Sequence, residues 1–180
     1  MSDELLHTFV ALNASFAKTY PINNVTFSPC FGRYEEDIYD GIDMSIANPW
    51  FLNTLAAAEY LYAIIPHILS PTEGGFNLSH PFFRAYVIPE DVVTFQFVLG
   101  MENEREVIAC KVALDADGRL DWIHRFRGEN GELSEQFSRI DGTQIGAKKL
   151  TWSYEAFLKA IDRRRSLGDW IEQCYDDGLV

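Results

Sequence analysis

The sequence predicts an α+β fold in which an antiparallel β-meander of about four strands is packed on one face by helices, in a two-layer single domain over residues 1–180. Three observations support this prediction. Apolar residues recur with helical spacing near both ends of the chain, they alternate with a period of two in the middle, and an Asp-Gly pair separates two alternating runs. A chain of 180 residues, 47% of them hydrophobic, is long enough to bury a core without staples.

The first helix is expected over residues 2–18, with Ser2 as its N-cap. Its apolar residues recur at three- or four-residue spacing: Leu5, Leu6, Phe9, Leu12 and Phe16. The periodicity then fails over residues 20–46, where proline, glycine and asparagine predict irregular structure with a short strand at Val25 to Phe27.

A second helix is expected to begin at the pair Asn48-Pro49 and to kink or end at Pro66. Because nearly every face of it is apolar, it is expected to be the central helix of the domain. Near the C-terminus, Thr151 or Ser153 is expected to cap a further helix that Gly168 ends. A short final helix is expected to carry Trp170, Ile171 and Cys174.

The predicted strands are residues 82–88, 92–99, 108–114 and 120–126. A three-residue loop with Gly118 in a left-handed conformation pairs Leu114 with Leu120 and Cys110 with His124. We prefer it to a two-residue turn, because a slip by one residue would move the apolar set to the wrong face. Residues 133–152 remain open between short strands and a loop.

The predicted pairing makes Cys110 and His124 neighbours, but their aromatic surroundings favour a buried, inert thiol over a catalytic pair. With Cys30 and Cys174 the chain has three cysteines, an odd number without a C-x-x-C spacing. This pattern fits a reducing compartment, and the acidic N-terminus shows no export signal, so a cytoplasmic location is expected.

No catalytic residue, cofactor or metal is predicted. The four histidines lack the spacing of a metal pair, and the Asp115-Ala116-Asp117-Gly118 turn has Phe126 where a calcium loop requires glutamate. Phosphate-binding glycine motifs and nucleophile elbows do not occur. The formal net charge of −12 argues against nucleic acid and membrane partners, and residues 49–69 contain too many polar residues for a membrane span.

The acidic segment of residues 34–43 is the predicted interaction site. Its predicted partner-binding residues are Tyr34, Glu35, Glu36, Asp37, Tyr39, Asp40 and Asp43. Aromatic side chains beside carboxylates are typical of an interface with a basic protein, because the rings supply buried contact and the charges steer encounter. The alternative is a solvated acidic loop whose aromatic residues pack into the core.

In size, acidity and lack of a catalytic motif the chain resembles bacterial immunity proteins, which implies a non-enzymatic protein that neutralises or escorts a basic partner such as a toxin. An alternative rests on Lys111 to Phe126, which looks like the final hairpin of the NTF2-like cone fold. That resemblance implies a pocket protein or a small-molecule isomerase or dehydratase, with His124 and either Tyr60 or Asp121 as acid and base.

Overall fold

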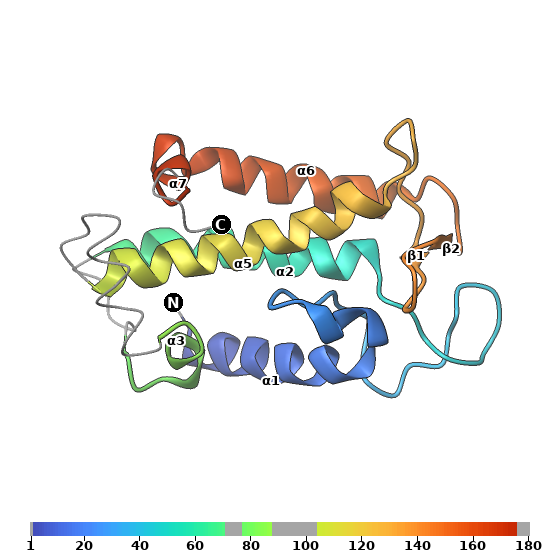
Figure 1. The fold of residues 1–180 in the computed structure, drawn as a ribbon, viewed down its shortest axis with the longest axis horizontal. Coiled ribbons are helices and arrows are strands. Elements are labelled where there is room, and N and C mark those ends of the chain that lie inside the picture. The colour runs from blue at the N-terminus through green and yellow to red at the C-terminus, as the bar shows by residue number, and fades with distance from the viewer. Residues whose placement is uncertain (1, 71–76, 88–103, 176–180) are drawn as a thin grey trace.

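The computed structural model describes residues 2–70, 77–87 and 104–175, and this part of the chain is mainly helical (Figure 1). In chain order its elements are α1 (Asp3–Thr19), the 3-10 helix η1 (Pro21–Val25), α2 (Phe51–Leu69), α3 (Pro81–Arg84), α5 (Glu104–Phe126), β1 (Gln136–Phe137), β2 (Gln144–Ile145), α6 (Thr151–Ser166) and α7 (Asp169–Gln173).

The long helices form layers. Helix α2 packs against α5 and α6, while α1 lies on the opposite side of the α2–α5 pair from α6 and meets α3 near its first turn (Figure 1). The β1–β2 hairpin lies with the loop of residues 31–50 at the end of the molecule where α2 begins. This end therefore brings together two long connections that are far apart in the sequence.

The predicted β-meander is wrong, because residues 104–126 form the single helix α5. Ile108, Val112, Ala116, Arg119 and Ile123 are all buried, at the three- or four-residue spacing of one helix face. The apolar alternation over residues 108–114 coincides with part of this stripe. A run of four to eight apolar residues cannot separate a strand from a buried helix by periodicity alone.

Gly118 was expected in a turn, but it lies within α5. A Cβ atom at this position would overlap the hydroxyl group of Ser28. The indole Nε1 of Trp122 also donates to the carbonyl oxygen of Ser28, at 2.8 Å. Gly118 thus permits the segment around Ser28 to approach the helix backbone closely. Tertiary packing, and not a turn, accounts for a glycine at this position.

The other strands predicted over described residues are not found either. Residues 81–84 form α3 where a strand was expected over 82–88, and Thr26 and Phe27 follow η1 without forming a strand. The strand expected over 92–99 falls outside the described residues. Because Lys111 to Phe126 is helical, the hairpin on which the likeness to the NTF2 cone rested does not exist.

The helices predicted at the two ends of the chain are confirmed. Helix α2, also predicted, begins at Phe51, after Asn48-Pro49, but it does not end at Pro66 and continues to Leu69. Gly168, with φ 57°, separates α6 from α7. Among the described residues no helix is both long and apolar enough to cross a membrane.

Residues 133–152, which the sequence left undecided between short strands and a loop, contain the antiparallel hairpin of β1 and β2. In this hairpin Gln136 pairs with Ile145, and Phe137 pairs with Gln144. In its connection Gly142 adopts φ 78°, and a Cβ atom there would overlap the ring of Phe126. The hairpin is thereby held against the last turn of α5.

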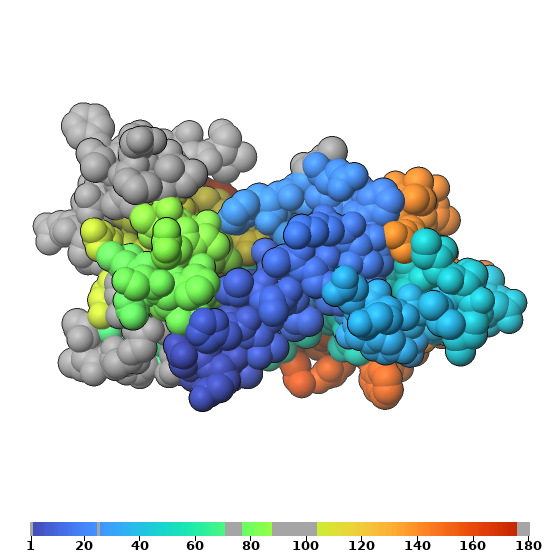
Figure 2. All heavy atoms as spheres, turned by 90° about the horizontal axis from the view of Figure 1, so that it is seen from below, coloured from blue at the N-terminus to red at the C-terminus, as the bar shows by residue number. Residues whose placement is uncertain are grey.

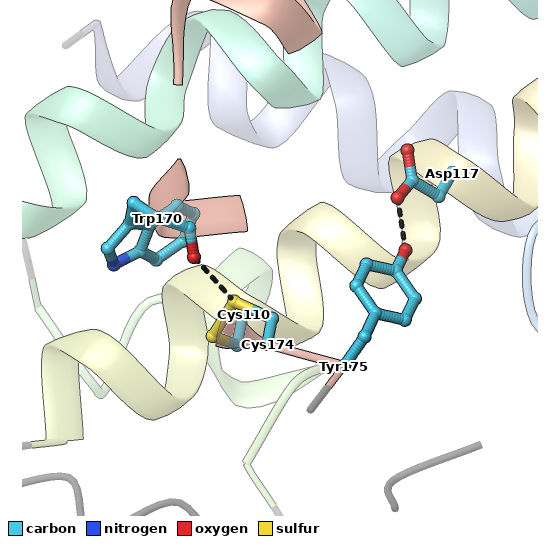
Figure 3. Close-up of a disulfide and its surroundings, with 5 residues drawn as sticks. All are labelled: Cys110, Asp117, Trp170, Cys174 and Tyr175. Atoms are coloured by element: carbon cyan, nitrogen blue, oxygen red, sulfur yellow. Dashed lines mark hydrogen bonds between the residues drawn. A yellow bond between two sulfur atoms is a disulfide. The ribbon is translucent and has the colours of Figure 1, made fainter. Parts of the chain in front are cut away.

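Cys110 on α5 forms a disulfide bond with Cys174, just after α7, whereas the sequence analysis expected a buried, inert thiol at Cys110 (Figure 3). Both cysteines are buried, and their Cα atoms lie 5.4 Å apart. The predicted pairing of Cys110 with His124 is also wrong. The two lie fourteen residues apart on one helix, a separation of about 21 Å along its axis, and His124 is exposed.

Candidate functional site

Arg33 organises the loop of residues 31–50. Its guanidinium lies 5.5, 5.2 and 5.1 Å from the ring centres of Tyr34, Tyr39 and Trp50. It also donates two hydrogen bonds to Asp37, of 2.8 and 2.6 Å, in the two-pronged geometry that arginine forms with a carboxylate. These hydrogen bonds lower the pKa of Asp37 and raise that of Arg33. The result is a fixed cation within a set of aromatic rings.

Glu135, just before β1, faces this cation from the hairpin. Its backbone N–H donates to the carbonyl oxygen of Ala147 at 2.9 Å, and its carbonyl oxygen accepts from the N–H of Phe51 at 3.3 Å. The hydroxyl of Tyr39 donates to Oε2 of its carboxylate at 3.1 Å. Glu135 is therefore fixed by the hairpin, by the start of α2 and by the loop.

The charges of the site keep Tyr39 protonated. Burial raises the pKa of the Tyr39 phenol, and both the hydrogen bond to Glu135 and the charge of that carboxylate raise it further. The same carboxylate contributes to the raised pKa of Arg33. A phenol that keeps its proton remains a donor to Glu135 over the whole range in which proteins normally function.

A cleft of about 590 Å³ lies beside the carboxylate, between residues 41–42 of the loop and residues 132–149 of the hairpin region. Gly146 lines it and adopts φ 78°. A Cβ atom at this position would lie 2.5 Å from Oε2 of Glu135, so the absence of a side chain on Gly146 leaves room for the carboxylate next to a residue that lines the cleft. Lys148 and Lys149 line the same cleft and add positive charge.

Polar contacts join the loop to the hairpin beneath the site. The amide nitrogen of Asn48 donates to the carbonyl oxygen of Asp40 and to the side chain of Gln136, at 3.1 and 3.3 Å. Its amide oxygen accepts from the N–H of Arg139 at 3.1 Å. Two buried donors, Nε1 of Trp50 and Nε2 of Gln136, have no hydrogen-bond partner among the described residues.

The seven residues predicted to bind a partner have different surroundings. Tyr34, Glu35, Glu36 and Asp43 are exposed, whereas Asp37 is buried against Arg33. Asp40 accepts from the N–H groups of Ile42 and Asp43 at 2.9 and 2.7 Å, which fixes the loop, and Glu35 accepts from Ser15. Of this set, Tyr39 alone contacts Glu135 among the described residues.

The sequence interpretation did not single out Arg33, Trp50 or Glu135. No short motif marks them, and Glu135 is 96 positions from the tyrosine that orients it. What could have identified the region is a solitary acid, between Ser134 and Gln136, ahead of the Asp141-Gly142 turn. That signal is weak, because the same letters are also consistent with an ordinary loop.

Of the two partners proposed for His124 in the NTF2-like alternative, Tyr60 does not meet it. His124 and Asp121 lie on the outside of α5, at a surface cleft of about 330 Å³ that borders α6. Tyr60 is on α2 and lines a different cleft, next to α1. An acid and base pair of His124 with Tyr60 is therefore excluded.

Three residues with metal-binding side chains, Asp3, His7 and His80, meet where α1 begins and α3 starts. Nδ1 of His80 accepts from the N–H of Phe82 at 3.1 Å, which places the imidazole proton on Nε2. That atom lies 3.3 Å from the carboxylate of Asp3. Through this approach the cluster joins α1 to the residue that precedes α3.

The geometry can be compared with proteins of known family. Residues 2–162 match the Glycosyl hydrolases family 15. The probable glucoamylase of Schizosaccharomyces pombe is 37% identical over 163 residues, which cover 91% of this chain and 34% of that protein. Glucoamylase 1 of Rhizopus oryzae is 34% identical over 167 residues, covering 88% of this chain and 27% of the relative.

Solved structures agree with the sequence matches. The glucoamylase from Saccharomycopsis fibuligera superposes with a TM-score of 0.76 at 28% identity, covering 91% of this chain and 35% of that one. The family 15 glucoamylase from Hypocrea jecorina gives a TM-score of 0.65 at 29% identity, over 94% of this chain and 28% of that one. The chain thus spans between about a quarter and a third of the length of these relatives and structures.

Proposed function

The chain belongs to the glycosyl hydrolases of family 15, and on this premise we propose that it carries one catalytic carboxylate, Glu135, of a site that hydrolyses glycosidic bonds in a glucan. The family has an α/α helical barrel fold, which replaces the expected α+β meander. The same matches overturn the hypothesis of an immunity-like protein with a basic or toxin partner. The glucan follows from the name glucoamylase that the relatives carry.

Glycoside hydrolysis normally requires two carboxyl groups on either side of the bond to be cleaved. Glu135 suits one of these positions, because its backbone is fixed at both ends and one carboxylate oxygen is oriented by Tyr39. Oε1 accepts no hydrogen bond from the described residues. This oxygen is available to activate a water molecule, or to attack the sugar directly if the second carboxyl group lies close enough for a covalent intermediate.

The second carboxyl group must hold a proton for the leaving oxygen, and the nearby acids do not suit that role. Asp37 is fully engaged by Arg33, which lowers its pKa. The pKa of Asp40 is also lowered, by the hydroxyl of Ser45 and by backbone N–H groups. A general acid needs a raised pKa, so it has to come from outside the loop and hairpin that hold Glu135.

The surroundings of Glu135 supply groups that a sugar ring can use. The exposed ring of Tyr34 and the half-buried ring of Tyr39 offer apolar faces beside the Arg33 cation. The unpartnered donors on Trp50 and Gln136 lie beneath the same loop. Sites for small polar ligands combine aromatic walls with a few placed hydrogen-bonding groups in this way.

The observation that carries the proposal is the Tyr39 to Glu135 hydrogen bond, whose carboxylate lies against Gly146, a residue that lines the cleft. It is tested by titrating the protein with maltoheptaose in a calorimeter and by repeating the titration with Glu135→Gln. We expect saturable binding that weakens by about tenfold in the variant, because a charge-assisted hydrogen bond to a sugar hydroxyl is lost.

Glu132→Gln is the matched control. Glu132 lines the same cleft, but its carboxylate accepts from Asn130 at 3.0 and 3.2 Å and makes no contact with Tyr39. Its variant is expected to bind the sugar as the wild type does. Binding that is absent, or that responds equally to the two substitutions, would refute the proposed role of Glu135.

A further inference from the structure

Three tripeptides of the chain have the form Asn-x-Ser or Asn-x-Thr, with a residue other than proline in the middle. They begin at Asn13, Asn24 and Asn77. This tripeptide is the acceptor sequence for N-linked glycans, which are attached to the side-chain amide of the asparagine. The sequence match alone is a weak signal, so the fold must show which of the three side chains reaches solvent.

Asn24 and Asn77 lie in short turns and are exposed. Asn24 belongs to η1, and the residue before it, Asn23, is buried with its amide donating to the carbonyl oxygen of Cys30 at 3.0 Å. Asn77 precedes α3, and its Oδ1 accepts from the N–H of Ser79 at 2.9 Å. Neither Asn24 nor Asn77 uses its Nδ2 atom to donate to a described residue. Both side-chain amides are therefore open to modification.

Both turns border a face of the molecule that Figure 2 shows. The residues around α3, in green, and the residues that follow α1, in a lighter blue, reach the surface there. Helix α3 lies at the end of the molecule opposite the β1–β2 hairpin (Figure 1). A glycan attached just before α3 therefore extends into solvent far from Glu135.

Asn13 has different surroundings, although it begins the same kind of tripeptide. It is half-buried on α1, and its Oδ1 accepts from Nη2 of the buried Arg119 at 2.6 Å. The hydroxyl of Ser15, the third residue of the tripeptide, donates to Glu35 at 3.0 Å. A glycan would pull the asparagine away from a buried guanidinium, which would then lose an acceptor. We expect Asn13 to stay unmodified in the folded protein.

The disulfide bond between Cys110 and Cys174 is an independent observation that agrees with glycosylation. Disulfide bonds form and persist in oxidising compartments, such as the lumen through which secreted proteins pass. N-linked glycans mark surface loops of proteins that take this same route. The two kinds of modification thus require the same environment, while the expectation of a cytoplasmic location rested in part on cysteines without a pairing.

We propose that Asn24 and Asn77 are N-glycosylation sites. The donor is an oligosaccharide carried on a polyprenyl diphosphate. Nδ2 of the asparagine forms a bond to the anomeric carbon of this oligosaccharide, and the bond from that carbon to the diphosphate breaks. The amide loses one proton and the polyprenyl diphosphate leaves, so the transfer needs no oxidant or reductant. The proposal does not depend on the role of Glu135.

The test translates the whole chain behind a cleavable signal peptide in the presence of microsomes, which contain the donor and the transferase. We expect two glycans, seen as two steps of slower migration on a denaturing gel that peptide-N-glycosidase removes. Asn24→Gln and Asn77→Gln should each lose one step, and the double variant should lose both. Because the readout is made on a denaturing gel, it does not require a variant to be stable.

Thr26 supplies a matched pair of controls, because the third residue of the tripeptide must carry a hydroxyl group. Thr26→Ser keeps the acceptor sequence and should retain both glycans, whereas Thr26→Val removes the hydroxyl at similar volume and should lose the glycan on Asn24. Asn13→Gln should lose none. Peptide-N-glycosidase should also remove both glycans from the folded protein without denaturant, since both asparagines are exposed.

A chain that gains no glycan would overturn the proposal, as would a glycan on Asn13 in place of either predicted one. So would a pattern that Thr26→Val leaves unchanged. The measurement is made without a glucan substrate, so it separates two failures. Two glycans together with maltoheptaose binding that ignores Glu135→Gln would refute the proposed function alone. Binding that depends on Glu135, in a chain that gains no glycan, would refute the glycosylation sites alone.

Discussion

Two carboxylates held by tyrosine hydroxyls serve different purposes in this molecule. Asp117, on α5, accepts four hydrogen bonds, from the hydroxyls of Tyr62 and Tyr175 and from two nitrogens of Arg164 (Figure 3 shows the contact with Tyr175). Glu135 accepts one hydrogen bond from the described residues, that of Tyr39. Both carboxylates are oriented, but Asp117 alone is saturated.

The difference teaches how to separate a structural acid from one available for chemistry. Asp117 joins α2, α5, α6 and the residues after α7, and it raises the pKa values of Tyr62 and Tyr175, which are already raised by burial. All lone pairs of the Asp117 carboxylate accept hydrogen bonds from the protein, so a substrate could bind it only by breaking these hydrogen bonds. Glu135 lies against Gly146, which lines a cleft, and its Oε1 accepts no hydrogen bond from the described residues. We expect changes around Asp117 to alter stability and changes around Glu135 to alter sugar handling.

The disulfide beside Asp117 should give the largest stability effect. Cys174→Ser opens a loop of 64 residues, and the chain-entropy model gives roughly 4 kcal/mol of lost stability for that length. Urea unfolding measures it. Dithiothreitol should lower the wild type to the level of the variant and leave the variant unchanged. A variant as stable as the oxidised wild type would show that the C-terminal contacts do not depend on the bond.

Asp117→Ala is expected to have the next largest effect, and to lower the free energy of unfolding by about 2–4 kcal/mol. The reason is that the buried hydroxyl of Tyr62 and the guanidinium of Arg164 lose their common acceptor. Asp121→Ala, at an exposed position of the same helix, should cost less than about 0.5 kcal/mol. Chemical unfolding compares the two. Similar losses in both variants would remove the distinction between a saturated carboxylate and a solvated one.

Gly142 tests the support of Glu135. Gly142→Ala should destabilise by about 1–3 kcal/mol, because φ 78° disfavours alanine and its Cβ atom would overlap Phe126. Gly131→Ala is matched to it, with φ 82° and no atom within 4 Å of the added Cβ, and should cost about 1 kcal/mol. If thermal melting showed equal costs, the contact between the hairpin and α5 would not contribute.

The smallest expected effect is the loss of one stabilising contribution, that of the Arg33–Asp37 pair, at low pH. The ordinary pKa of Asp37 is 3.8 and the hydrogen bonds from Arg33 lower it in the folded state. A lowered folded pKa means that the pair stabilises the protein above about pH 4 and that this contribution disappears as the pH falls through the folded pKa. Asp37→Asn should therefore melt below the wild type at pH 6, and the gap should narrow toward pH 2. A gap independent of pH would rule out this linkage.

The sequence predicted α1, α2, α6 and α7, because their apolar spacing and end signals are local. It failed at α5, whose middle contains Asp115, Gly118 and Arg119, residues typical of turns. In the structure Asp115 and Arg119 form a buried ion pair at 3.3 Å, and Arg119 donates to Asn13 on α1. These residues lie in a helix because they make tertiary contacts with residues about ninety or more positions away in the sequence. No local sequence pattern can reveal such contacts.

The candidate site was predicted in part. Tyr39 and Asp37 belong to the acidic segment that the sequence singled out, and both lie in the site cluster, but the charge pattern suggested a protein partner. In the structure, Tyr39 of this segment contacts the guanidinium of Arg33 and donates a hydrogen bond to Glu135 from the hairpin. The function depends on that long-range pairing, which the sequence alone did not indicate.

The central claim is that Glu135 is a catalytic carboxylate, and glucose release tests it most directly. This chain is co-expressed with the part of the Saccharomycopsis fibuligera glucoamylase that it does not match, and the co-purified assembly is supplied with maltoheptaose. The initial rate is compared for wild type, Glu135→Gln and Glu132→Gln. We expect Glu135→Gln to lower the rate by about 10²–10⁴-fold and Glu132→Gln to change it less than about threefold. A formed assembly that releases no glucose, or a Glu135→Gln rate equal to that of the wild type, would contradict the claim.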